Sequence, residues 1–290
     1  MSRAQTLDPM HELSIARCAA SLALSVALSL ALAACSSAPP ADVARGHLVI
    51  VGGGGTGPEI IARTMQLAGA ANARVAVLPQ ASELPDRGVD SAQMWRDAGA
   101  KEVVNVEFTD LDAARRAIEQ ADLIWFPGGD QVRLMGDLEK AGVVDLVQRR
   151  FHDGATVGGT SAGAAVMSTP MITGEGEELL TRIAGDSTKT ANGLGLFAGA
   201  IVDQHFVRRQ RANRLIGAVL DHPDHVGFGI DERTALVVSG TQLEVIGEGC
   251  VVVFDARRSK VEPLTPGKPS AATGMSMQVL RQGMQFEFRP

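Results

Sequence analysis

Short apolar runs alternate with amphipathic stretches along the chain from residue 47 onward. The runs are rich in valine, isoleucine and leucine, which is typical of strands buried in a parallel sheet. The stretches between them carry apolar residues at three- and four-residue spacing, the pattern of helices with one buried face. This alternation predicts an α/β domain with a doubly wound, mostly parallel sheet. The expected strands are 47–51, 74–78, 103–106, 123–126, 155–158, 201–203 and 235–238, and the expected helices are 58–67, 91–98, 111–120, 131–140 and 143–151.

The C-terminal end follows a different pattern. Segments 242–246, 250–254, 277–280 and 285–288 are short and alternate between apolar and polar residues, with glycine and proline between them. Such segments are typical of antiparallel strands joined by turns. We therefore expect short antiparallel C-terminal strands at the edge of the sheet.

The N-terminal segment differs from both patterns. Residues 21–34 form an uncharged apolar run of signal-peptide length, too short to span a bilayer comfortably. Arg17 supplies a positive flank, and small residues precede Cys35, which resembles the lipobox of bacterial lipoprotein precursors. The sequence therefore predicts a lipoprotein signal peptide over 1–34 and lipidation of Cys35. A plain secretory signal without a lipid is the alternative.

The rest of the chain divides into a tether and one folded part. Residues 35–45 are mostly small residues and proline, so we expect a flexible tether there and a single domain over 46–290. With lipid on Cys35, the protein would be exported and anchored to a membrane, in the periplasm or at the cell surface. The formal charge of −6 argues against a nucleic-acid partner. Cys250, the one cysteine inside the domain sequence, lies in an apolar run and is expected to be a buried strand residue.

Ser161 stands in the sequence Gly-Gly-Thr-Ser-Ala-Gly-Ala, directly after a predicted strand. The small residues that follow it are compatible with a helix. Such a turn lifts a serine hydroxyl clear of the sheet and points a helix N-terminus at whatever the serine attacks. Ser161 is therefore the expected nucleophile, and a serine that only caps the helix is the alternative.

A serine hydroxyl needs a base to become a good nucleophile. His205 follows the predicted strand 201–203, whereas the other histidines of the domain lie at a strand start, a helix end or a surface turn. A carboxylate is then needed to orient the imidazole and to stabilise its charged form. Glu232, just before the strand 235–238, is the first choice. Other loop carboxylates remain open as the acid: Glu175, Glu177, Glu178 and Asp231.

Negative charge that develops on an attacked carbonyl needs fixed donors, and main-chain amides supply them. The sequence offers the amide of Ala162, directly after the expected nucleophile, and that of Gly129, in the turn that ends the strand 123–126. We expect these two amides to form the oxyanion hole. A plain strand-to-helix connection is the alternative for Gly129.

Four motifs occur in the order found in cyanophycinases: Pro-Gly-Gly-Asp-Gln at 127–131, Gly-Thr-Ser-Ala-Gly-Ala at 159–164, Asp-Gln-His-Phe at 203–206 and Gly-Ile-Asp-Glu at 229–232. The chain thus resembles the cyanophycinases, which belong to the S51 serine peptidases together with peptidase E. The resemblance implies a class I glutamine-amidotransferase-like (flavodoxin-like) fold, with Ser161 as nucleophile and His205 as base. It also suggests a homodimer.

Cyanophycinases cleave cyanophycin, a poly-aspartate backbone that bears arginine on each side chain, and release β-Asp-Arg dipeptides. The resemblance implies a substrate pocket lined by Gln131, Asp203, Gln204, Arg209, Arg211 and Arg214. Arginines beside acids and amides suit a substrate that bears both carboxylates and guanidinium groups. The expected function is hydrolysis of cyanophycin by an exported serine exopeptidase. An aspartyl dipeptidase or isopeptidase activity of the same family is the alternative.

Two other kinds of protein fit parts of the sequence. Residues 52–57 satisfy G-x-G-x-x-G after a strand and before a helix, as in NAD-binding proteins, but the acidic residue such proteins carry after the second strand is missing. A non-catalytic surface lipoprotein that kept the fold is the other alternative, and it predicts that Ser161→Ala leaves all function intact. No cofactor or metal is expected, because the sequence has no compact cluster of ligand residues.

Overall fold

Within residues 45–174 and 181–290, which the computed structural model describes, eight strands form one sheet. Their order is β16-β11-β10-β1-β5-β4-β2-β3. The parallel strands are β1 (His47–Val51), β2 (Arg74–Val77), β3 (Glu102–Asn105), β4 (Leu123–Phe126) and β5 (Thr156–Thr160). Antiparallel pairing continues the sheet beyond β1 through β10 (Thr234–Ser239), β11 (Gln242–Gly247) and β16 (Gln285–Glu287).

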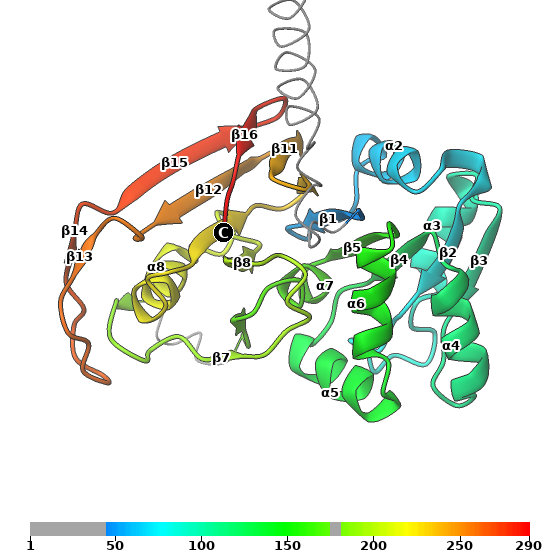
Figure 1. Ribbon diagram of the computed structural model, residues 1–290, viewed down its shortest axis with the longest axis horizontal. Helices are drawn as coiled ribbons and strands as arrows, with labels where there is room; N and C mark the ends of the chain where they lie inside the picture. The colour runs from blue at the N-terminus through cyan, green and yellow to red at the C-terminus, as the bar shows by residue number, and fades with distance from the viewer. Residues whose placement is uncertain (1–44, 175–180) are drawn as a thin grey trace, which may run out of the picture. The chain divides into compact units, whose positions relative to one another are not determined.

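Helices cover both faces of the parallel half of this sheet (Figure 1). One face carries α2 (Pro58–Leu67) and α3 (Val89–Asp97), with the short helix η1 (Ala70–Asn72) between them in sequence, and the other face carries α4 (Leu111–Gln120), α5 (Gln131–Ala141) and α6 (Val144–His152). In β1, Val49 and Val51 pack in the core beneath α2 and α3, whereas Leu48 and Ile50 pack in the core beneath α4 to α6. Because successive side chains of a strand point to opposite faces, both faces are buried. The predicted doubly wound α/β fold is confirmed.

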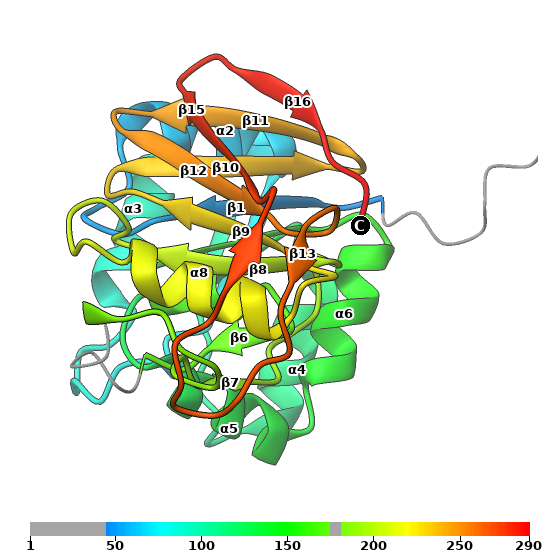
Figure 2. The same ribbon diagram turned by 90° about the vertical axis from the view of Figure 1, so that its left-hand side faces the viewer.

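A second sheet lies beside the first, with the order β15-β12-β9-β8. Its strands are β8 (Ala200–Gln204), β9 (Val226–Ile230), β12 (Cys250–Asp255) and β15 (Ser276–Arg281). Val202 and Phe228 on its inner face join the main core, and Ile201 and Val252 on its outer face pack with residues of α8 (Ala212–Asp221). Figure 2 shows α8 lying across this outer face.

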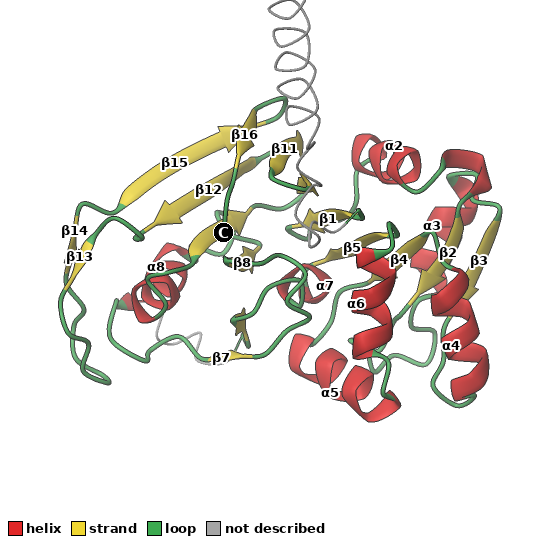
Figure 3. Cartoon of the chain, in the orientation of Figure 1, coloured by secondary structure: helices red, strands yellow, loops and turns green. Residues whose placement is uncertain are grey.

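The second sheet differs from the arrangement that the sequence predicts. The expected strand 201–203 belongs to it rather than to the main sheet, where the expectation put it, and so do two of the expected C-terminal edge strands. Strands dominate the chain after α8 (Figure 3). Cys250 opens β12 and is half-buried rather than buried.

β9 is missing from the predicted strands because two of its five residues are glycine, which disfavours a strand. Both glycines are required by close neighbours. A Cβ on Gly229 would lie 2.4 Å from the ring of Phe206, and a Cβ on Gly227 would lie 2.6 Å from Val219. Four two-residue strands are too short to leave a pattern: β6 (Met171–Ile172), β7 (Thr190–Ala191), β13 (Lys260–Val261) and β14 (Ala272–Thr273).

The predicted signal peptide over 1–34, Cys35 and all but the last residue of the tether over 35–45 lie outside the described residues. In residues 45–174 and 181–290, every helix is too short or too polar to cross a bilayer.

Candidate active site

Ser161 occupies a constrained turn between β5 and α7 (Ala162–Ala165). Its backbone angles, φ 54° and ψ −111°, are ones that residues with a side chain seldom adopt. Hydrogen bonds on both sides hold the turn: the Ser161 amide donates to the carbonyl of Val51 at 3.0 Å, and the Ser161 carbonyl accepts from the amides of Ala164 and Ala165. The backbone therefore fixes where the hydroxyl stands, at the carboxyl edge of the parallel strands.

A chain of hydrogen bonds leads away from this hydroxyl. Ser161 Oγ lies 2.9 Å from His205 Nε2, and His205 Nδ1 lies 2.7 Å from Glu232 Oε1. A neutral imidazole that donates from Nδ1 to the carboxylate keeps Nε2 free to accept the serine proton. The arrangement can therefore activate a serine nucleophile.

Electrostatics favour the protonation states that this chemistry needs. Burial lowers the pKa of His205, and the cations of Arg209 and Arg211 lower it further, while the hydrogen bond to Glu232 opposes the shift. The hydrogen bond from His205 lowers the pKa of Glu232. At neutral pH the imidazole is therefore a free base beside an ionised carboxylate.

The glycine-rich loop after β1 packs directly against the base and the acid. Gly53 has φ +100°, and a Cβ there would lie 2.3 Å from the His205 ring; a Cβ on Gly54 would lie 2.6 Å from Glu232 Cβ. The loop also bonds to the segments that carry the base and the acid. The His205 amide donates to the Gly52 carbonyl and the Arg233 amide donates to the Gly53 carbonyl, each at 2.7 Å. A Cβ on Gly52 would lie 2.1 Å from the Asp231 carbonyl oxygen, so contacts with the strands that carry the base and the acid account for Gly52 and Gly54 of the NAD-binding pattern.

Of the two residues whose amides are expected for the oxyanion hole, Ala162 lies next to Ser161 in the chain and Gly129 lies in the pocket wall with Ser161. Ala162 is the first residue of α7, so its amide has no acceptor within the helix. Gly129 follows Gly128, at which a Cβ would lie 3.4 Å from Ser161 Cβ and 3.9 Å from its Oγ. Among the described residues, no backbone carbonyl accepts from the amide of Ala162 or of Gly129.

A pocket of about 390 Å³ opens at the hydroxyl. Four of the six side chains that the sequence suggests for the substrate line it: Gln131, Gln204, Arg209 and Arg211. The remaining lining residues are Gly129, Asp130, Val132, Arg133, Ser161, Thr173 and Gly174. Three of the lining side chains are guanidinium groups, which gives the pocket a positive character suited to carboxylates.

Two lining side chains are held by specific hydrogen bonds. Gln131 Nε2 donates to the carbonyl of Ile172 at 3.0 Å. Arg211 Nη1 donates to Gln204 twice, to its carbonyl at 2.8 Å and to its side-chain Oε1 at 2.5 Å. These bonds fix the orientation of the amide groups at the rim and of the guanidinium beside them.

Asp203 and Arg214 lie behind this pocket rather than in its wall. The Asp203 carboxylate is fully buried and accepts from Arg214 Nε at 2.9 Å and Nη2 at 2.5 Å, and from the Gln204 amide at 2.8 Å. Arg211 Nη1 lies 3.9 Å from the same carboxylate. The pair therefore supports the residues that face the pocket.

Sequence reasoning missed Arg133 as a pocket residue. It stands in the first turn of α5, two positions after Gln131, and pairs with Glu83 at 2.6 Å. The position within that turn was the available signal, because residues at the start of this helix share the edge that carries Ser161. The family motif at 127–131 ends at Gln131 and does not reach Arg133.

The other candidate acids do not take the place beside the imidazole. Asp231 accepts from the Arg208 amide at 3.1 Å, while its neighbour Glu232 faces His205. Glu175, Glu177 and Glu178 lie outside the described residues. In the part of the chain that the structure describes, no group of three or more His, Cys, Asp or Glu residues could hold a metal ion.

Comparison with known proteins identifies the family of this chain. The model of peptidase family S51 matches residues 42–246. A cyanophycinase from Trichormus variabilis is 37% identical over 242 residues, covering 79% of this chain and 80% of that protein. A cyanophycinase from Geminocystis herdmanii is 34% identical over 252 residues, covering 82% of this chain and 90% of that protein.

Solved structures share the fold. A peptidase from an acI-B1 actinobacterium superimposes with a TM-score of 0.61 at 22% identity, covering 84% of this chain and 98% of that one. Since the family model spans more than half of the sequence and two relatives exceed 30% identity over most of it, this chain belongs to peptidase family S51 and is a serine-type peptidase.

Proposed function

We propose that this peptidase hydrolyses cyanophycin to β-Asp-Arg dipeptides, with Ser161 as nucleophile, His205 as base and Glu232 as acid. One observation carries the proposal: the hydrogen-bonded chain Ser161–His205–Glu232 ends in a pocket lined by guanidinium and amide groups. The relatives named cyanophycinase, at 34% and 37% identity, support the choice of substrate.

The reaction follows from the positions of these groups. Ser161 Oγ attacks the carbonyl carbon of the scissile bond while His205 Nε2 takes the hydroxyl proton. The carboxylate of Glu232 stabilises the imidazolium, and the amides of Gly129 and Ala162 stabilise the oxyanion. His205 then gives the proton to the leaving amine. In the second half, a water molecule gives a proton to the same imidazole and attacks the acyl-enzyme, and Ser161 Oγ leaves and takes that proton back from His205.

Substrate recognition uses the charges around the pocket. Arg209 and Arg211 pair with carboxylates of the terminal unit of the polymer, and Gln131 and Gln204 bond to its amide groups. Pairing of the terminal carboxylate with these arginines anchors the chain end beside Ser161, which makes the enzyme an exopeptidase. Asp203 and Arg214 keep Arg211 and Gln204 in place from behind.

Activity assays on purified protein test the proposal. Wild type, Ser161→Ala and His205→Ala are incubated with cyanophycin, and the products are analysed by mass spectrometry, with circular dichroism to check the fold. We expect β-Asp-Arg from the wild type and none above background from either variant. Equal product from all three proteins would exclude this mechanism. Cleavage of α-aspartyl dipeptides without release of β-Asp-Arg would assign the dipeptidase alternative.

We also propose that the protein is exported and anchored through lipid on Cys35. The apolar run at 21–34 followed by small residues and this cysteine supports the proposal. Cells expressing the full chain are labelled with radioactive palmitate and fractionated. Wild type should carry label in the membrane fraction and Cys35→Ser should not; unlabelled, released wild-type protein would favour the plain secretory signal.

A further inference from the structure

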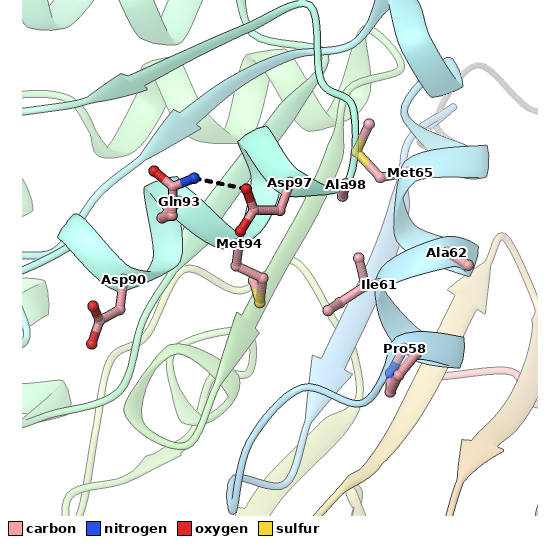
Figure 4. A pocket seen from close by; sticks show the side chains of 9 residues that line it. All are labelled: Pro58, Ile61, Ala62, Met65, Asp90, Gln93, Met94, Asp97 and Ala98. Carbon is pink, nitrogen blue, oxygen red and sulfur yellow. Dashed lines mark hydrogen bonds between the residues drawn. The ribbon is translucent and has the colours of Figure 1, made fainter.

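A groove of about 630 Å³ lies between α2 and α3, outside the pocket at Ser161. Figure 4 shows its floor, where Ile61 and Met65 of α2 and Met94 of α3 point into the space between the helices. The other lining residues are Pro58, Ala62, Asp90, Gln93, Asp97 and Ala98. An apolar cavity of this size with few polar groups is suited to bind a ligand side chain.

The polar groups of the groove all come from α3 and include two acids. Asp90 and Asp97 are seven residues apart, so they lie on one face of the helix about 10 Å apart along its axis. Both are exposed, and neither forms an ion pair with another described residue; Asp97 accepts a hydrogen bond from Gln93 at 2.7 Å. No basic residue lines the groove. An aliphatic floor below unneutralised carboxylates suits an alkyl chain that ends in a cation.

The groove begins near the active site. α2 follows the loop whose Gly53 and Gly54 contact His205 and Glu232. α3 follows the segment around Ala81, whose carbonyl accepts from the amide of Asp130 in the pocket wall at 2.8 Å. Both helices therefore start at the sheet edge that carries the pocket.

Charge is divided between the two places. The pocket is lined by three guanidinium groups, those of Arg133, Arg209 and Arg211, and one carboxylate, that of Asp130, whereas the groove is lined by two carboxylates and no cation. Each β-Asp-Arg unit of the polymer carries both the guanidinium group and the free carboxylate of its arginine, so the pocket suits the carboxylate of one unit and the groove suits the guanidinium of another.

We propose that the α2/α3 groove is an exosite that holds arginine side chains of the polymer while the chain end occupies the pocket. This inference rests on the proposed function. The three methylenes of an arginine lie on Ile61, Met65 and Met94, and the guanidinium pairs with Asp90 or Asp97. A second attachment raises the effective concentration of the chain end at Ser161, so it lowers the KM for long substrates and leaves kcat unchanged.

Kinetics on substrates of two lengths test the exosite. The double variant Asp90→Asn with Asp97→Asn is compared with the wild type on two soluble substrates. One is an oligomer of about ten repeats, and the other is the two-repeat unit, which is meant to occupy the pocket and not the groove. We expect KM for the long oligomer to rise about threefold to tenfold at low salt, with kcat and the short substrate unaffected. Equal effects on both lengths, or no effect on either, would overturn the exosite.

A matched control separates the groove from general charge. Asp112→Asn with Glu119→Gln removes two exposed acids, also seven residues apart, from α4 on the other face of the sheet. This variant should behave as wild type on both substrates. Ala62→Lys, at an exposed position of the groove, should reproduce the KM effect of the double variant. A control variant that raises KM equally would overturn the exosite.

Binding without turnover separates this inference from the proposed function. The long oligomer is titrated calorimetrically into Ser161→Ala with and without the two groove substitutions. Weaker binding by the groove variant supports the exosite, and equal binding rejects it. A wild type that hydrolyses no oligomer rejects the proposed function, whatever the titration gives. A dimer in light scattering that the groove substitutions dissociate would assign the groove to a second copy of the chain and overturn the exosite.

Discussion

The buried pair of Asp203 and Arg214 is expected to support the pocket rather than to contact substrate, and Asp203→Asn tests this. The substitution keeps the shape and removes the charge that Arg214 meets through two hydrogen bonds. Breaking a buried ion pair from one side costs about 3 to 5 kcal/mol, because the other charge stays buried and unpaired. For a domain of this size, that corresponds to a fall in Tm of roughly 10 °C.

The assay combines stability with kinetics. Urea unfolding and thermal melts give the free energy of unfolding, and steady-state kinetics below the melt give kcat and KM. Asp255→Asn is the control, because Asp255 pairs with Arg257 at 2.9 Å near the surface and its loss should cost at most about 1 kcal/mol. The double variant Asp203→Leu with Arg214→Met removes both charges and should recover most of the lost stability.

The opposite result would refute this interpretation. If Asp203→Asn melted like the wild type but lost affinity for substrate, the carboxylate would serve the ligand and not Arg214. The interpretation is supported if Asp203→Asn loses much of its stability and also changes kcat, and if the double variant partly reverses both effects. The two outcomes differ in stability, so a fall in activity alone does not decide between them.

Other substitutions address the triad and its loop. Glu232→Gln should lower kcat about a thousandfold or more with little change in the melt, because the half-exposed carboxylate orients and stabilises His205; near-normal turnover would remove it from the mechanism. The acidic limb of the kcat/KM profile should lie below the ordinary histidine pKa of 6.5, because His205 must be neutral to act as base and burial lowers its pKa. Arg209→Gln removes a cation that lowers this pKa, so the limb should move toward neutral pH; an unmoved limb would show that another group sets it. Gly53→Ala and Gly55→Ala impose the same strain, since both have φ +100°, but a Cβ at Gly55 meets nothing within 4 Å, whereas one at Gly53 meets the imidazole. Activity should therefore fall far more in Gly53→Ala, and equal losses would mean that backbone strain alone matters.

The parallel half of the fold is readable from sequence because each strand there is a continuous apolar run. Val49 and Leu48 are both buried, on opposite faces, so periodicity and burial agree. The sequence does not predict β9, because its glycines are required by close contacts with Phe206 and Val219, which are neighbours in space and not in sequence. No local pattern encodes such contacts.

The same distinction applies to the site. Ser161, His205 and Glu232 each end or precede a strand, so sequence could place them at one edge of a sheet. Asp203 also lies at the end of a predicted strand, 201–203, but its side chain does not reach the pocket. Side chains of a strand alternate between the two faces, and the Asp203 carboxylate is buried against Arg214 of α8. The family resemblance places Asp203 in the substrate pocket together with Gln204 and Arg211, and only the structure shows that Asp203 lies behind the pocket while the other two line it.

The hydrogen bonds from Ser161 to His205 and from His205 to Glu232 lie where the two sheets meet. The pairing of strands within each sheet sets the positions of these residues. In the second sheet, parallel pairing sets Gln204 of β8 opposite Ile230 of β9, so the residues that follow, His205 and Glu232, leave adjacent strand ends together. Ser161 belongs to the first sheet, where its amide is tied to Val51. The glycine-rich loop joins the sheets through bonds to the backbone of His205 and Arg233. The distance from Ser161 to His205 therefore depends on how closely this loop lets the sheets approach, which is why a single methyl group at Gly53 should separate the base from the nucleophile.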